Sequence, residues 1–123
     1  MITEAIQSIL EPHVNSYSPI VESDILPDGV FVIHQENIID TLRDKTEIYA
    51  MVYNVAVIII GDSQEDIDPI IDTVITEILT CEGEILGTII EDIELKGTQG
   101  TTWDDEKKKY YDKITFTVQT KNR

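Results

Sequence analysis

The stretch IYAMVYNVAVIII, Ile48–Ile60, decides the fold. Its residues are β-branched, aromatic or otherwise apolar at nearly every position, on both parities of a strand. Such a pattern is typical of a strand buried on both faces, at least toward its C-terminal end. Gly61 and Asp62 end the run. We therefore expect a long central strand here and interpret the rest of the chain by what pairs with it and what covers it.

The next segment carries the clearest helix signal. Apolar side chains recur at i, i+3, i+4 and i+7 and form one stripe: Ile67, Ile70, Ile71, Val74, Ile75, Ile78 and Leu79. Pro69 is tolerated only in a first turn, which predicts that regular helix begins near Asp66–Asp68 and ends near Cys81. A shorter helix is expected over Ile2–Leu10, because apolar residues fall at helical spacing there before Pro12.

Three further segments have the composition of strands. Val30–Asn37 and Ile85–Lys96 are rich in β-branched residues, and Lys109–Thr120 alternates between an apolar face and a polar one. Residues 37–46 are more polar and are either a helical turn or an excursion between strands. The order is helix, strand, strand, helix, strand, strand. It predicts an α+β fold: a four-stranded, mostly antiparallel sheet with one long and one short helix packed on one face.

Length and composition limit the class of protein. With 123 residues we expect one domain spanning residues 1–123, with long loops at 11–29 and 97–108. No apolar run approaches the roughly 20 residues that cross a bilayer, and the N-terminus does not resemble a signal peptide. The single cysteine, Cys81, cannot form an internal disulfide, which fits synthesis in the cytoplasm.

The charge is large and unevenly placed. The net charge is −15. Residues 1–95 hold two basic and twenty acidic residues, a charge of −18, whereas residues 96–123 hold seven basic and four acidic residues, a charge of +3. An acidic body opposes binding to phosphate backbones. The basic C-terminal segment raises the question of which acidic surface it faces.

Acidic clusters are the first candidates for chemistry. The segment DSQEDID contains Asp62, Glu65 and Asp66, but its spacing does not match an EF-hand loop, and helix capping explains it better. A second cluster, Glu91, Asp92 and Glu94, lies on a predicted strand. Neighbouring residues of a strand point to opposite faces, so we interpret these acids as solvent or interface charge rather than a catalytic pair.

No other catalytic or metal-binding pattern emerges. His13 and His34 lie far apart, without zinc-ligand spacing, and Cys81 ends an acidic helix, where a thiolate is disfavoured. Glycine motifs for phosphate binding are absent. We expect no enzymatic activity, no cofactor and no metal.

The segment TTWDDEKKKYYDK, Thr101–Lys113, concentrates aromatic and charged residues. Its four acids balance its four lysines, which weakens a nucleic-acid reading. We interpret it as a hairpin that contacts another subunit. The candidate contact residues are Trp103, Lys107, Lys108, Lys109, Tyr110 and Tyr111. The complementary acidic surface, or an acidic lumen, is predicted to comprise Asp62, Glu65, Asp66, Glu91, Asp92 and Glu94.

The layout resembles the small tail-completion or tail terminator (head–tail joining) proteins of long-tailed bacteriophages. The shared features are the short N-terminal helix, the Pro-containing segment SPIVESDILPDGVFVIH, the strand YAMVYNVAVIIIG, the capped helix DSQEDIDPIIDTVITEIL and the last strand KITFTVQT. The resemblance implies a hexameric ring in the virion, at the end of the tail tube. Such a ring joins the tube to the head connector while DNA passes through without tight binding, and the family has no catalytic residues to transfer.

Two other classes of function remain open on the residues alone. A monomeric acidic adaptor, or a DNA mimic that binds a basic protein partner, would suit the charge equally well. A small-ligand or metal-binding domain is less favoured, because few polar groups converge. Light scattering distinguishes a ring of about six subunits from a monomer.

Overall fold

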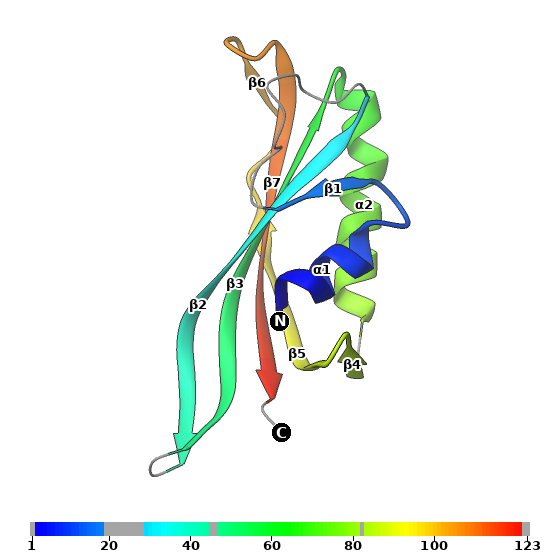
Figure 1. Cartoon of the computed structure of the whole chain (residues 1–123). Helices are drawn as coiled ribbons and strands as arrows, with labels where there is room; N and C mark the ends of the chain where they lie inside the picture. The colour runs from blue at the N-terminus through cyan, green and yellow to red at the C-terminus, as the bar shows by residue number, and fades with distance from the viewer. Residues whose placement is uncertain (1, 19–28, 45–46, 82, 122–123) are drawn as a thin grey trace.

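The computed structural model describes residues 2–18, 29–44, 47–81 and 83–121 (Figure 1). Two helices lie on one side of a curled, mixed β-sheet. In chain order the elements are α1 (Ile2–Leu10), β1 (Asn15–Tyr17), β2 (Phe31–Asp44), β3 (Glu47–Gly61), α2 (Gln64–Thr80), β4 (Gly83–Ile85), β5 (Thr88–Thr98), β6 (Thr102–Asp104) and β7 (Lys109–Lys121).

Among the described residues, the sheet has seven strands in the order β1-β2-β3-β7-β5-β4, and β6 also pairs with β7. Of these strand pairs, only β1–β2 is parallel. The long strands β2, β3, β7 and β5 form the antiparallel centre, in which β5 carries two bulges and β2 and β3 carry one each where they pair. Such bulges bend a strand and increase its local twist. They account for the curl of the sheet.

The core lies between the sheet and the helices. On β3 and β7 the buried face consists of Val55, Val57, Ile59, Ile114, Phe116 and Val118. Opposite pairs such as Val55 and Phe116 share a face in the register of the two strands. The helices contribute Ile2, Ile6, Leu10, Ile67, Val74 and Ile78 to the same cluster. The alternation predicted for β7 is confirmed, since Thr115, Thr117 and Gln119 lie on its other, half-exposed face.

The long helix begins earlier than its proline suggested. Ser63 is the N-cap, and its hydroxyl accepts a hydrogen bond of 3.2 Å from the backbone N–H of Asp66. Pro69 therefore lies inside α2 rather than in its first turn. It lacks the N–H that would bond to the carbonyl of Glu65. Both residues are exposed, so that carbonyl lies on the solvent side, where water replaces the missing donor.

The predicted four-stranded sheet with helix, strand, strand, helix, strand, strand order is wrong. The sheet has seven strands, and it is mixed rather than simply antiparallel. The additional strands β1, β4 and β6 have only three residues each. Three residues are too few to show an alternation of apolar and polar side chains. Such a segment forms a strand because a longer neighbouring strand pairs with it.

Pairing with a long neighbouring strand also explains where the boundaries of the elements differ from the prediction. Residues 37–44, expected as a turn or an excursion, continue β2 because β3 pairs with them up to Asp44. The loops expected at 11–29 and 97–108 contain β1 and β6, and β5 extends to Thr98. Residues 19–28 of the first loop lie outside the described residues.

The β3–β7 core predicts a sharp difference between two neighbouring positions. Phe116→Ala removes a fully buried ring and should lower the free energy of unfolding by about 3–5 kcal/mol. Thr117→Ala, on the half-exposed face, should cost less than about 1 kcal/mol. Urea unfolding followed by circular dichroism measures both. Equal losses would contradict the placement of the core.

Candidate functional site

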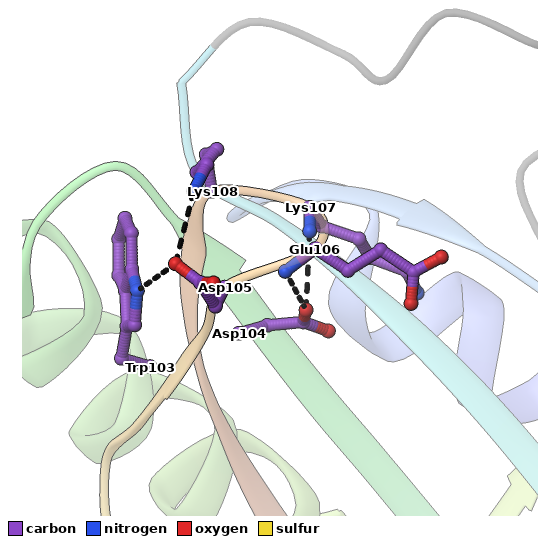
Figure 2. Close-up of polar contacts among 6 residues, drawn as sticks. All are labelled: Trp103, Asp104, Asp105, Glu106, Lys107 and Lys108. Carbon is purple, nitrogen blue, oxygen red and sulfur yellow. Dashed lines mark hydrogen bonds and ion pairs between the residues drawn. The ribbon is translucent and has the colours of Figure 1, made fainter.

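The β6–β7 hairpin holds the residues predicted to contact a partner (Figure 2). Trp103 pairs with Tyr110 across the two strands, and their rings meet edge to face with centroids 4.8 Å apart. The indole nevertheless remains 45% exposed. An aromatic ring fixed by a neighbour but open to solvent loses little entropy on binding, which suits an interface anchor.

The turn of this hairpin is held by two aspartates (Figure 2). Asp104 accepts hydrogen bonds from the backbone N–H groups of Glu106 (3.0 Å) and Lys107 (3.1 Å), as in an Asx turn. Asp105 accepts from Lys108 Nζ at 2.9 Å, and the indole N–H of Trp103 approaches the same oxygen at 3.5 Å. Asp104 and Asp105, two of the four acids in this segment, therefore stabilise the turn.

Most of the lysine run is already engaged within the chain. Lys109 is ion-paired with Asp62, at the end of β3, and Lys108 with Asp105. Among the described residues, Lys107 forms no ion pair and is exposed. Tyr111 is half-buried, opposite Ile60 on β3 and Thr102 on β6. The role of the run against another subunit stays a prediction, and it rests chiefly on Lys107.

The predicted acidic residues fall into two separate groups. Asp62, Glu65 and Asp66 surround the start of α2, close to the β3 end that pairs with Tyr110. Asp92 and Glu94 lie opposite Gln119 and Thr117 of β7. At ~3.3 Å per residue along a strand, the groups are roughly 25 Å apart.

Local contacts already use several of these acids. Glu91 accepts a hydrogen bond of 3.0 Å from Gln119 Nε2, and Glu94 is paired with Lys96 at 3.3 Å. At the other end of the chain, hydrogen bonding to the backbone at the start of α1 lowers the pKa of Glu4. No group of acids, histidines and cysteine suited to a metal ion occurs within the described residues.

Apart from Leu79 on α2, the exposed large apolar side chains of the described residues lie on hairpins. Ile38 and Ile39 on β2 are 56% and 57% exposed, and Leu86, between β4 and β5, is 65% exposed. Together with Trp103 they mark three hairpins that extend from the sheet (Figure 1). Sequence reasoning missed Ile38, Ile39 and Leu86, because an exposed isoleucine or leucine looks the same in a sequence as a buried one.

The outer edge of β2 is another feature that the sequence did not reveal. β1 pairs only with Phe31–Ile33, although β2 continues to Asp44. In the part of the chain that the structure describes, no strand pairs with the outer edge beyond Ile33. Ile38 and Ile39 lie on this open stretch, near the middle of β2. An unpaired, partly apolar edge is a template for another strand.

The turn between β4 and β5 is strained. Leu86 has φ of 48° and Gly87 has φ of 83°. Two consecutive positive φ values between paired strands are typical of a type I′ turn, where Asn-Gly is the preferred sequence. A leucine at the first position costs conformational energy and places an apolar side chain in solvent. Such an outlier is a reason to suspect function at this position.

Comparison with known proteins points to one architecture. No protein-family model matches the sequence, and no curated protein matches it. Among solved structures, a chain of the "Virion of native gene transfer agent (GTA) particle" superposes with a TM-score of 0.70. The match covers 95% of this chain and 84% of that chain at 11% sequence identity. At that identity the likeness shows a shared fold. Separately, no helix among the described residues is long and apolar enough to cross a membrane.

Leu86→Asn should stabilise the isolated protein. Asparagine adopts positive φ more readily than leucine, so relief of the turn should raise the free energy of unfolding by about 1 kcal/mol. Leu79→Asn is the matched control, because Leu79 is also exposed but lies in α2. Urea unfolding measures both variants. A Leu86→Asn protein no more stable than wild type would contradict strain at the turn.

Proposed function

We propose that this chain is a structural subunit of a phage-like virion, and that it forms a ring at the end of the tail tube. There it terminates the tail and joins it to the head connector. The observation that carries the proposal is the fold, which matches a virion chain of a gene transfer agent particle along 95% of its length. The sequence layout independently resembles tail terminators.

The sheet edges support assembly with other copies. Among the described residues, no strand pairs with the outer edge of β2 from His34 to Asp44, and β4 pairs with β5 only at Thr88–Ile90. Two different open borders on one chain permit a head-to-tail contact, and such contacts close into rings when the rotation fits. Both borders carry acids and at least one bulge, but the exposed apolar pair Ile38 and Ile39 makes that of β2 the more adhesive.

The charge distribution supports passage of DNA without retention. Helices α1 and α2 contain six acidic residues and no lysine or arginine: Glu4, Glu65, Asp66, Asp68, Asp72 and Glu77. Each phosphate neutralised by a protein cation adds affinity for DNA, so a conduit benefits from walls without cations. We therefore assign the acidic helix layer to the lumen, and the exposed apolar residues Ile38, Ile39, Leu86 and Trp103 to contacts with neighbouring subunits.

A second function has one observation in its favour. The same acidic helix layer would suit a monomeric adaptor or DNA mimic that occupies a basic groove of a partner protein. This alternative does not require the open edge of β2 or the exposed Ile38 and Ile39. Assembly therefore distinguishes the two functions.

Electron microscopy and light scattering of the purified protein test the ring. We expect particles of about six subunits with a central hole, with assembly increasing with concentration. Ile38→Ser with Ile39→Ser should reduce assembly by at least tenfold, because it removes apolar contact area worth more than ~1.4 kcal/mol. Leu79→Ser, an equally conservative change on α2, is the control. A monomer at all concentrations that binds a basic protein would favour the adaptor.

Duplex DNA binding tests the conduit. We expect the assembled protein to bind DNA more weakly than proteins that bind DNA non-specifically, with Kd above about 10⁻⁴ M at physiological salt. Electrophoretic mobility shift measures it, with an engineered Asp68→Lys, Asp72→Lys variant as the positive comparison. Tight binding by the wild-type ring would contradict an acidic lumen.

A further inference from the structure

A buried polar network connects α1 to the sheet. His34, on β2, is fully buried, and the side chain of Glu36, two residues along the same strand, is only 1% exposed. His34 Nδ1 lies 2.5 Å from Glu36 Oε1, and His34 Nε2 lies 2.7 Å from Oε1 of Gln7 on α1. These contacts join two segments 27 residues apart in sequence. The proposed function does not depend on these contacts.

The orientation of the Gln7 amide fixes where protons must be. Its nitrogen donates to the backbone carbonyl of Ser16 at 3.1 Å, and a carbonyl oxygen can only accept. Flipping the amide would place two acceptors face to face at that contact, so Oε1 must be the atom that faces His34. An amide oxygen cannot donate. Nε2 of His34 therefore carries a proton.

The other ring nitrogen needs a proton as well. A neutral histidine protonated at Nε2 has a bare Nδ1, which would face the carboxylate of Glu36 as acceptor against acceptor at 2.5 Å. The contact is favourable only with a proton between the two atoms. Either His34 is an imidazolium beside a carboxylate, or Glu36 is protonated and donates to Nδ1. In both cases the pair holds one proton more than neutral histidine and ionised glutamate together.

We propose that Gln7–His34–Glu36 is a proton-dependent latch that fixes α1 on the sheet, and that the His34–Glu36 pair holds this proton for as long as α1 is docked. Glu36 Oε2 is buried without a hydrogen-bond partner among the described residues, so loss of the proton would leave a bare buried carboxylate beside a bare ring nitrogen. Burial without compensating hydrogen bonds is strongly unfavourable. Release of α1, which exposes both groups to water, relieves it.

Among the described residues, few other charged groups face the network. The residues opposite His34 and Glu36 on β3 are Val57 and Val55, which do not titrate. On α1, Glu4 and Glu11 just beyond it are exposed, and the titratable residue of β1 is Tyr17, which packs on Phe31. On α2, Glu77 lies 3.4 Å from His13, in the turn after α1.

The sign of the pH dependence follows from proton counting. When α1 is docked the pair holds a proton, whereas in the released segment histidine loses its proton near neutral pH while glutamate stays ionised. The docked state therefore binds more protons and is weakened as pH rises.

Nuclear magnetic resonance of the ring nitrogens and glutamate carboxyl carbons tests the proton directly. At about pH 8, above the range in which free histidine titrates, we expect His34 to show a protonated Nε2, with the second proton on Nδ1 or on Glu36. His13, half-exposed in the same molecule, serves as the internal reference. A neutral His34 beside an ionised Glu36 would overturn the latch. This measurement needs only the wild-type protein.

Hydrogen exchange tests the consequence for α1. In wild type, exchange of the amides of residues 2–10 should accelerate as pH rises beyond the intrinsic chemical effect, relative to amides of β7 in the same sample. Glu36→Gln mimics a protonated glutamate, because its amide N–H can donate to Nδ1 of neutral His34. Its α1 should therefore stay docked across the pH range, and the excess pH dependence of exchange should be lost. His13→Gln is the control and should keep the exchange rates and the excess pH dependence of wild type. A Glu36→Gln protein whose α1 exchange still follows wild type across the pH range would overturn the proposal.

Discussion

The pairing of β3 with β7 is the constraint on which the rest of the molecule depends. Twelve consecutive residue pairs run from Ala50 with Lys121 to Gly61 with Tyr110. Their shared buried face provides the surface on which both helices pack. The opposite face, on the side without helices, carries the half-exposed Thr115 and Thr117 of β7. β2 joins this pair at the border of β3, and β5 and β6 join it at β7, so its twist sets the direction of each hairpin that leaves the sheet.

Segments whose state depends on their own side chains could be predicted from sequence. The apolar run at Ile48–Ile60, the stripe from Ile67 to Leu79 and the alternation around Phe116 each carry a period over several turns or pleats. β1, β4 and β6 could not be predicted, because each forms only where a long neighbour provides hydrogen bonds. The same reason explains residues 37–44: their polar composition indicates a turn, yet β3 opposite them supplies a complete partner.

The candidate site shows the same division. Trp103 and Tyr110 were predictable as a pair, because an aromatic-rich hairpin flanked by alternating strands brings such residues together. The partners of the lysines were not predictable, since Asp62 reaches Lys109 from 47 residues away. Nor does a sequence reveal which isoleucines face solvent. The tertiary pairing that leaves β2 without a neighbour beyond Ile33 exposes Ile38 and Ile39, and no local pattern encodes that outcome.

The long reach of the β3–β7 pairing has a consequence for how the chain folds. Tyr110 follows Gly61 by 49 residues, and Lys121 follows Ala50 by 71. The chain loses the entropy of closing these long loops before the contacts between the strands can stabilise it. Topologies of this kind therefore fold slowly, in roughly milliseconds to seconds. Until the last strand is made and docks, β2 and β3 form a local hairpin whose apolar face has no cover. The newly synthesised chain is then most exposed to mispairing with other copies, which gives its large negative charge a protective role before any assembly begins.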